Sequence, residues 1–192
     1  MGRGFTSELG DSVLTIRFDR PEIRNPLSVS VLEDLNVSLD TLGSSSLKAV
    51  IFTGMADVFA SGADLREIAS VTPETVREFG LLGQELMTRI AELPQTTIAA
   101  VNGVCFGGAL DLALACDRRI ASPNAKFAHP GAGLGIITGW GGTQRLPRLV
   151  GRGNALEMFF TAEAIDADRA LAISLIDEIA DDPLAKAIEA VL

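Results

Sequence analysis

"NGVCFGGALDLALACDRRIAS", residues 102–122, is the stretch that decides the fold class. The glycine pair Gly107–Gly108 opens an apolar segment over 107–117 that predicts a helix. The apolar run 96–103 before it predicts a buried strand that ends in glycine, and 118–122 after it predicts another strand. Strands that alternate with helices and end in glycine indicate an α/β fold, in which the loops after the strands carry function.

One carboxylate, Asp111, stands inside this apolar helix, three residues after Gly108. An apolar setting disfavours the charged form of a carboxyl group and so raises its pKa, which suits the group for acid and base work near neutral pH. Asp111 is therefore the first candidate for a catalytic group.

The alternation of strands and helices continues on both sides of this stretch. No repeat, linker or low-complexity tract interrupts it, which indicates a single domain. The patterns predict strands over 12–20, 48–54 and 126–130, a turn over 21–28, a loop running into a helix over 55–70, helices over 28–42, 73–93, 139–151, 153–161 and 183–191, and a helix followed by a strand over 165–180.

Composition and charge exclude several classes of protein. The 192 residues are 47% hydrophobic, enough for a sizeable core, and the net charge of −9 argues against a nucleic-acid-binding face. No apolar run has membrane-spanning length and the N-terminus lacks the apolar core of a signal peptide, so we expect a cytoplasmic protein without a membrane partner. Cys105 and Cys116 are predicted to be buried thiols, and one histidine without a Cys/His cluster argues against a metal site.

Two loops rich in small residues share one design. "FASGAD" at 59–64 and "GVCFGGA" at 103–109 both place small residues just before a helix begins. Backbone N–H groups at a helix N-terminus are free, and glycine lets another molecule approach them closely. Two such groups aimed at one oxygen would stabilise an oxyanion. The alternative, that a helix start after a strand needs glycine for geometric reasons alone, stays open at this point.

These loops belong to a longer pattern that resembles a known family. "FDRPEIRNPLS", "FASGADLREI", "NGVCFGGALDLALACDRRIAS" and "FAHPGAGLGIITGWGGTQRLPRLVGRGNALEMFFTAEAIDADRAL" follow one another in the order found in the enoyl-CoA hydratase/isomerase (crotonase) superfamily, from about residue 5 to about residue 182. The resemblance implies the α/β crotonase (ClpP-like) fold, a repeated ββα spiral core in which helices wrap two nearly perpendicular sheets.

The resemblance also divides the chain. Residues 1–182 correspond to the crotonase-like spiral domain, and residues 183–192 to a short remnant of a C-terminal helical region that is truncated relative to the family. In the family those helices complete the contacts of a homotrimer or of a hexamer built as a dimer of trimers, help cover the active site and contact the CoA adenine. We therefore expect the short C-terminus to bear on assembly and on CoA affinity.

The family resemblance implies an acyl-CoA thioester as substrate, with no separate cofactor because coenzyme A is part of the substrate. The backbone N–H groups of Ala63 and Gly108 would hold the thioester oxygen as an enolate forms, and losing one such donor costs about 3–4 kcal/mol. Gly103 would serve the tight turn before the second donor. Further substrate- and CoA-binding positions are expected at Arg24, Ala60, Ser61, Gly62, Asp64, Leu65, Gly107, Gly131 and Trp140.

For three residues at or near these binding positions, a purely structural role is the alternative to a role in binding. Asp64 stands where a residue would cap the helix that it opens. Trp140 either forms a wall of the acyl pocket or packs in the core. Glu67 either reaches the cleft or is a solvated charge on its helix.

The sequence departs from the family at its proton-transfer groups. Hydratases of the family use two glutamates, and the first of these positions is Asp111, one methylene shorter. The second position is Gly131, which carries no carboxylate. His129 is the only histidine and shares a face with Gly131 if 126–130 is a strand, so it is a candidate second acid or base. A hydrogen-bonded structural histidine is the alternative.

Three functions compete on these observations. The first is an acyl-CoA enzyme of the hydratase or isomerase type, with Asp111 as the main proton-transfer group. The second is a decarboxylase of malonyl-type thioesters, because loss of CO₂ itself generates the enolate and Gly131 would leave room for a substrate carboxylate. The third is a catalytically impaired member of the family that only binds acyl-CoA or serves assembly.

Overall fold

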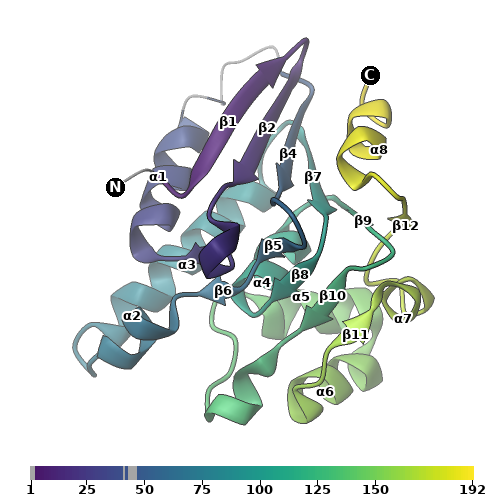
Figure 1. Cartoon of the computed structure of the whole chain (residues 1–192). Coiled ribbons are helices and arrows are strands. Elements are labelled where there is room, and N and C mark those ends of the chain that lie inside the picture. Colours follow the sequence, from purple (N-terminus) through teal and green to yellow (C-terminus); the bar gives the residue numbers. More distant parts are fainter. Residues whose placement is uncertain (1–2, 41, 43–46) are drawn as a thin grey trace.

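A six-stranded sheet runs through the molecule, as Figure 1 shows for the computed structural model, which describes residues 3–40, 42 and 47–192. Its order is β1-β2-β4-β7-β9-β12, and every neighbouring pair is parallel except the β1–β2 hairpin. All of β4 is buried, as expected for a parallel strand covered on both faces. The strands are β1 (Phe5–Gly10), β2 (Val13–Phe18), β4 (Ala49–Thr53), β7 (Thr96–Val101), β9 (Arg118–Ala121) and β12 (Glu178–Ile179).

A second sheet alternates with the first along the chain. Its four strands are ordered β11-β10-β8-β5, and a two-stranded pair, β3–β6, stands beside them. After β4, β7 and β9 the chain enters β5, β8 and β10 in turn and then forms helices, so the predicted α/β fold with a repeated ββα core is confirmed. These strands are β3 (Pro26–Leu27), β5 (Val58–Ala60), β6 (Gly62–Ala63), β8 (Val104–Phe106), β10 (Lys126–Ala128) and β11 (Ile165–Asp166).

The helices surround α4, which is buried from Ala109 to Ala115 and therefore has an apolar sequence on all sides. It contacts α3, α5, β6 and β8. In α3, Leu86 and Ile90 are buried, whereas Val76 is exposed. The helices are α1 (Val29–Asp40), α2 (Leu65–Ser70), α3 (Val76–Ala91), α4 (Gly108–Ala115), α5 (Gly142–Val150), α6 (Arg152–Thr161), α7 (Ala167–Ala172) and α8 (Pro183–Glu189), with 3-10 turns η1 (Pro21–Ile23) and η2 (Pro130–Leu134).

The main sheet has a core on each face. The larger core holds α1, α3 and α4, and alternating residues of β2 such as Ile16 and Phe18 point into it, as the sequence pattern predicts. On the opposite face, α8 packs Ala187 against a cluster that includes Val13 and Ile51. Figure 1 shows this last helix beside the strands. The division of the chain at residue 182 stays a prediction.

Several boundaries differ from the sequence-based expectations. The loop expected over 55–70 contains the two short strands β5 and β6, because strands of two or three residues are too short to show a period. Strand β1 was not predicted, because its residues after Phe5 are all exposed and show no alternation of buried and exposed positions. Strand β10 ends at Ala128 rather than at residue 130, since Pro130 begins η2. The helix expected over 28–42 is α1, and position 41 lies outside the described residues.

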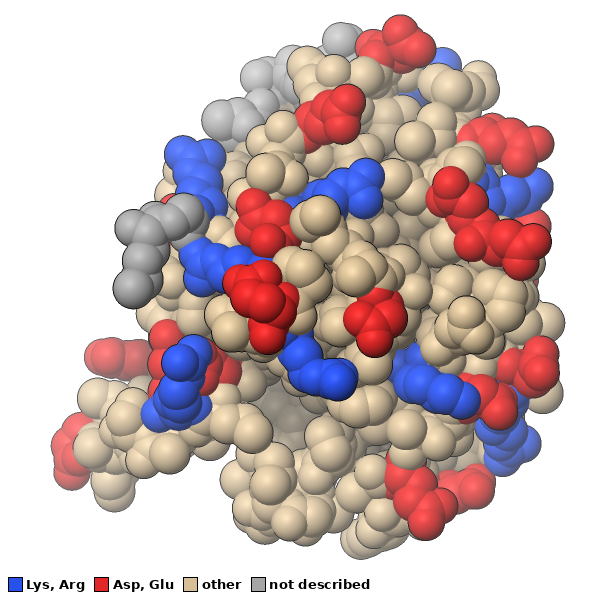
Figure 2. Space-filling view, viewed as in Figure 1, with Lys and Arg blue, Asp and Glu red and all other residues tan. Residues whose placement is uncertain are grey.

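Charged side chains of both signs are interspersed over the face shown in Figure 2, and the hollow in its lower half is bordered mainly by uncharged residues. Among the helices of the described residues, none combines the length and the apolar character needed to cross a membrane.

Candidate active site

A cavity of about 620 Å³ opens between the α2–α3 region and the segment that follows β10. Both of the predicted loops contribute to it, so residues far apart in the chain meet at one site. The predicted site residues in its wall are Ser61, Ala63, Leu65, Gly107, Gly108, Asp111, His129, Gly131 and Trp140. Val76 and Phe79 of α3 also line the cavity, which explains why this end of α3 is less buried.

A second cavity, of about 680 Å³, shares Ser61, Ala63, Leu65, Pro130 and Leu134 with the first, and Asp64 is among the residues that line only the second. Three residues of the strip of chain from Ser61 to Leu65 thus line both spaces. A substrate with two parts, one in each cavity, would pass over the backbone of this strip.

Three predicted binding residues line neither cavity. Ala60 is fully buried in β5 and Gly62 packs against backbone, so neither offers a side chain to a ligand. Arg24 has an exposed side chain and a left-handed backbone, with φ of 65°. Its carbonyl accepts the N–H of Ser61 at 3.0 Å, so Arg24 supports the strip through its backbone.

The two loops touch each other at Gly62 and Gly108. Gly62 has φ of +90°, and a Cβ there would lie 2.5 Å from the carbonyl oxygen of Phe106 and 2.8 Å from the nitrogen of Gly108. A Cβ on Gly108 would run into the ring of Trp140. Close packing therefore accounts for both glycines. The same packing puts the backbone of Ala63, next to Gly62, beside the first N–H of α4, which has no partner inside its own helix.

Asp111 is fully buried, and its two oxygens have different surroundings. Oδ2 accepts hydrogen bonds from the hydroxyl of Thr138 and from the backbone N–H of Trp140, the latter at 3.3 Å. Oδ1 has no hydrogen-bond partner among the described residues. Burial raises the pKa of Asp111 to about 6, although both hydrogen bonds and the positive charge of Arg145 act to lower it.

His129 lies next to Asp111 in the wall of the cavity. Its Nε2 lies 3.6 Å from Oδ1 of Asp111, and its ring is 5.2 Å from that of Phe159. Neither ring nitrogen has a hydrogen-bond partner among the described residues, which does not support the alternative of a hydrogen-bonded structural histidine. The role of His129 as an acid or base stays a prediction. The argument from a strand over 126–130 is wrong, because β10 has ended, yet the side chain still reaches the cavity. Burial lowers the pKa of His129 to about 4.

Gly131 offers less space than the sequence implied. A Cβ at this position would lie 2.5 Å from the carbonyl oxygen of Ile136. The N–H of Ile136 donates to the carbonyl of Gly131 at 2.9 Å, which closes the turn tightly over this glycine. A side chain at this position would therefore meet the Ile136 backbone, although Gly131 itself lies in the cavity wall.

The structure shows the contacts of three other residues for which alternatives were open. Asp64 caps α2 by accepting the N–H of Arg66 at 2.9 Å, and its carboxylate pairs with the Arg66 side chain. This pairing lowers the pKa of Asp64. Glu67 does not serve the cleft, because its carboxylate accepts the N–H of Val29 at the start of α1 at 2.8 Å. Trp140 is both buried in the core and part of the cavity wall.

Thr138 is the residue of this site that sequence reasoning missed. It lies in the "GIITGWGG" segment, where no periodic pattern marks a side chain as buried or exposed. Its role is visible only once the fold brings the loop back over α4.

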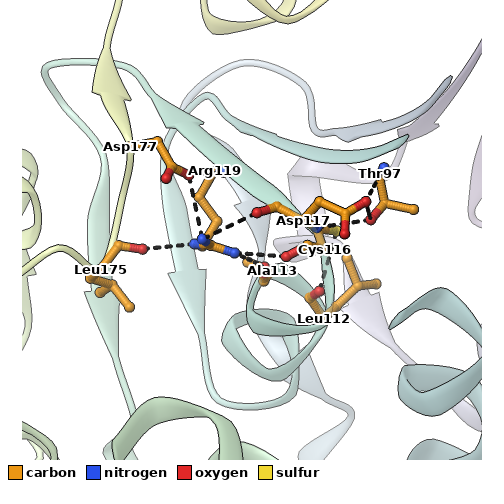
Figure 3. A network of polar contacts seen from close by, with 8 residues as sticks. All are labelled: Thr97, Leu112, Ala113, Cys116, Asp117, Arg119, Leu175 and Asp177. Atoms are coloured by element: carbon orange, nitrogen blue, oxygen red, sulfur yellow. Dashed lines mark hydrogen bonds and ion pairs between the residues drawn. The ribbon is translucent and has the colours of Figure 1, made fainter. Parts of the chain in front are cut away.

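A network at the other end of α4 holds this helix in place (Figure 3). Arg119 is 5% exposed, and its guanidinium donates to the carbonyls of Cys116 at 2.7 Å and Leu175 at 2.9 Å. The carboxylate of Asp117 accepts the N–H and the hydroxyl of Thr97 at 2.8 and 2.9 Å. Because one end of α4 is tied down, the residues at its other end keep a fixed place in the cavity wall.

Both cysteines are buried and unpaired, which confirms the prediction of buried thiols. Burial raises the pKa of Cys105, and that of Cys116 to about 12. The described part of the chain contains no group of three or more His, Cys, Asp or Glu side chains that could hold a metal ion.

A buried carboxylate with one unbonded oxygen, close to a helix N-terminus and in the wall of an apolar cavity, is the arrangement of a site for proton transfer. The family model for enoyl-CoA hydratase/isomerase matches residues 8–190. The chain therefore belongs to the enoyl-CoA hydratase/isomerase family.

Two relatives and one solved structure illustrate the similarity. The chain is 41% identical to the short-chain-enoyl-CoA hydratase of Clostridium acetobutylicum, over 88% of this chain and 66% of that protein. It is 39% identical to the crotonyl-CoA hydratase of Syntrophomonas wolfei, over 90% of this chain and 67% of that protein. The crystal structure of an enoyl-CoA hydratase from Bacillus anthracis superposes with a TM-score of 0.93 at 36% identity, over 98% of this chain and 75% of that one. The chain thus spans about two thirds of the length of the curated relatives.

Proposed function

We propose that this protein adds water to enoyl-CoA thioesters and moves their double bonds, with Asp111 as the proton-transfer group. The observation that carries the proposal is the unbonded, buried Oδ1 of Asp111 in the wall of the same cavity as the backbone of Gly108. The names of the similar hydratases support the substrate class.

The oxyanion hole is formed by the N–H groups of Ala63 and Gly108. The thioester oxygen gains negative charge when the chain becomes an enolate, and two fixed donors stabilise that charge without reorganising. The contact between Gly62 and the nitrogen of Gly108 supports this assignment, because it holds the two segments side by side.

Hydration needs one proton to leave water and one to reach the substrate. Asp111 Oδ1, ionised above its pKa of about 6, accepts a proton as the water oxygen bonds to the β-carbon. The enolate then takes that proton at its α-carbon, which returns the carboxylate. One water is consumed, and a single carboxylate is enough for the balance.

Isomerisation uses the same carboxylate without water. Asp111 removes the α-proton of a 3-enoyl thioester and returns it to the γ-carbon of the enolate. Because this transfer needs one base rather than two, the glycine at position 131 does not obstruct it.

The cavity disfavours the decarboxylase alternative. Asp111 and His129 are the ionisable side chains in its described wall, and no Lys or Arg among the described residues lines it. An acyl group with its own carboxylate would therefore face Asp111 without a cation to pair with.

The working form that we propose is a cytoplasmic homotrimer or hexamer that takes coenzyme A as part of its substrate and no separate cofactor. Exposed apolar side chains on α6, Leu156 and Phe160, are 43% and 78% exposed and support association of copies. The buried free cysteines support a reducing compartment.

Turnover of crotonyl-CoA and of a 3-enoyl-CoA by the wild type and by Asp111→Ala tests the proposal. We expect loss of about 10²–10⁴-fold in both rates. Asp168→Asn, an exposed carboxylate on α7, is the control and keeps wild-type rates. Equal rates for wild type and Asp111→Ala would remove Asp111 from the mechanism. Acyl-CoA binding without turnover would favour the binding subunit, and CO₂ release from methylmalonyl-CoA the decarboxylase.

A further inference from the structure

We propose that Thr138 is a positioning residue that holds one oxygen of Asp111, so that only the other, Oδ1, faces His129 and the reacting atoms. This inference rests on the proposed function for its catalytic meaning, but the arrangement itself can be tested without a substrate.

The two hydrogen bonds with resolved geometry are both on one oxygen of the carboxylate, and the backbone N–H of Gly142 adds a weaker contact that also favours the charged form. The Thr138 hydroxyl and the Trp140 N–H both donate to Oδ2, and they come from the same short segment after η2. An aspartate has only two rotatable side-chain bonds, so two donors on one oxygen fix where the other oxygen points. The segment that carries Thr138 and Trp140 therefore sets the direction of the free oxygen.

Oδ1 of Asp111 borders a small space beside Gly142, which the side chains of Thr138 and His129 also border. A Cβ on Gly142 would collide with Asp111 Oδ1, and it would lie 2.8 Å from Cγ2 of Thr138 and 3.0 Å from Cε1 of His129. Only a glycine at the start of α5 leaves this meeting point open. Thr138, Asp111 and His129 thus converge from three separate elements.

The charges that act on Asp111 come from its neighbours on every side. Arg145 of α5 supplies a positive charge, while its guanidinium donates to the carbonyls of Trp140 and Met87 at 3.4 and 3.2 Å. His129 is uncharged near neutral pH, because burial lowers its pKa. Cys105 of β8 lies close enough for the carboxylate to help raise its pKa, so the thiol is neutral. The Thr138 hydroxyl is the strongest of the contacts that favour the charged carboxylate.

The removal of the Thr138 hydroxyl has two consequences. The pKa of Asp111 rises, because a hydrogen bond to its charged form is lost. The carboxylate can also rotate, because Oδ2 keeps only the longer bond to Trp140.

Nuclear magnetic resonance of the imidazole tests this directly, because His129 is the only histidine and gives a single unambiguous ring signal. We expect the neutral ring to carry its proton on Nε2, toward Asp111. Its signals should show an inflection near pH 6, as Asp111 ionises beside it. Asp111→Asn should remove that inflection. Thr138→Val should move it from about 6 to about 7, and Thr138→Ser should restore it.

The matched control is Thr143→Val, which removes a nearby hydroxyl that accepts from the side chain of Gln144 and does not bond Asp111. It should leave the inflection in place. The indole signal of Trp140, the only tryptophan, reports whether each variant is folded. If Thr138→Val does not fold, Thr138→Ala carries the same test. An inflection that stays at its wild-type pH in the hydroxyl-free variant, or a proton on Nδ1, would overturn the inference.

Kinetics then separate the two proposals. If the wild type turns over crotonyl-CoA, Thr138→Val should lower kcat/KM by roughly 10-fold to 100-fold and move its acidic limb upward by the same amount as the imidazole inflection. KM should change little, because Thr138 does not hold the substrate. If the wild type turns over no thioester, the proposed function fails, while the imidazole titration still decides the role of Thr138.

Discussion

The Oδ1 atom of Asp111 and the Nε2 atom of His129 lie 3.6 Å apart in the cavity wall, too far for a direct hydrogen bond, and neither has another partner among the described residues. Buried polar atoms without partners are rare, because each costs the free energy of its lost hydration. Two of them facing each other mark a place where a third group, such as a water molecule or a thioester substrate, completes the bonding.

Asp111 and His129 should each make the free energy of unfolding depend on pH. Because the two contributions have opposite signs, they become visible only in variants that lack one of the two groups. The Asp111 pKa is raised from 3.8 to about 6, so its contribution to the free energy of unfolding is present below pH 4 and lost by about pH 6, a change of about 3 kcal/mol. The His129 pKa is lowered from 6.5 to about 4, so its contribution is present above pH 6.5 and lost as the pH falls to 4. The two effects oppose each other in the wild type.

Urea unfolding at pH 4, 5, 6 and 7 measures these contributions. Relative to the wild type, Asp111→Asn should gain about 3 kcal/mol of stability between pH 4 and 7, and His129→Gln should lose a similar amount over the same range. Asp168→Asn, at an exposed position, should give a flat difference curve. A flat difference for Asp111→Asn would show that the carboxyl group titrates in the folded protein as it does in the unfolded chain.

Much of the fold could be predicted from sequence, and the reason lies in long apolar segments with clear ends. The burial of α4 and of β4 follows from continuous apolar runs, and the glycine-ended strand before α4 follows from the same pattern. The short strands β5 and β6 could not be predicted, because a pair of residues has no period. They take their conformation from the strands beside them.

The candidate site was predictable where the backbone pattern itself carries the chemistry. Gly108 and Asp111 share one helix, so a single turn of α4 fixes their spacing. The contact of Thr138 with Asp111 spans 27 positions and depends on how a loop returns over α4, which no local pattern records. His129 was predicted at the site for a reason that was wrong, since β10 ends before it.

Restoring a side chain at position 131 should destabilise the protein. Gly131→Ala would press its methyl group against the Ile136 carbonyl, 2.5 Å away, and the tight turn between these residues has no room to relax. We expect a loss of about 1–3 kcal/mol in the free energy of unfolding. Gly133→Ala in the same 3-10 turn meets no atom within 4 Å and is the control, expected within about 0.5 kcal/mol of the wild type. Equal stability of the two variants would contradict the close approach of Ile136.

Trp140 should be displaced by a single methyl group on α3. A Cβ on Gly83 would overlap the indole ring, so Gly83→Ala should cost about 1–3 kcal/mol and lower the hydration rate, because the N–H of Trp140 also holds Asp111. Gly80→Ala lies one turn earlier with nothing within 4 Å, and it should stabilise the helix by about 0.5–1 kcal/mol. Thermal unfolding and tryptophan fluorescence compare the two variants. A stabilising Gly83→Ala would place the indole elsewhere.

The C-terminal end of α4 lies away from the cavity. The stability of the contacts that hold it should depend on the shape of the Arg119 side chain and not only on its charge. The guanidinium serves the carbonyls of Cys116 and Leu175 and lies 3.4 Å from Asp177, contacts that approach it from different sides. A lysine has a single nitrogen and cannot reproduce this fork, so Arg119→Lys leaves at least one buried carbonyl without a donor. The expected loss in urea unfolding is about 1–3 kcal/mol. Arg118→Lys, at the neighbouring and more exposed position, should stay within about 0.5 kcal/mol of the wild type. If both substitutions cost the same, the charge of Arg119 rather than its fork would be what secures α4.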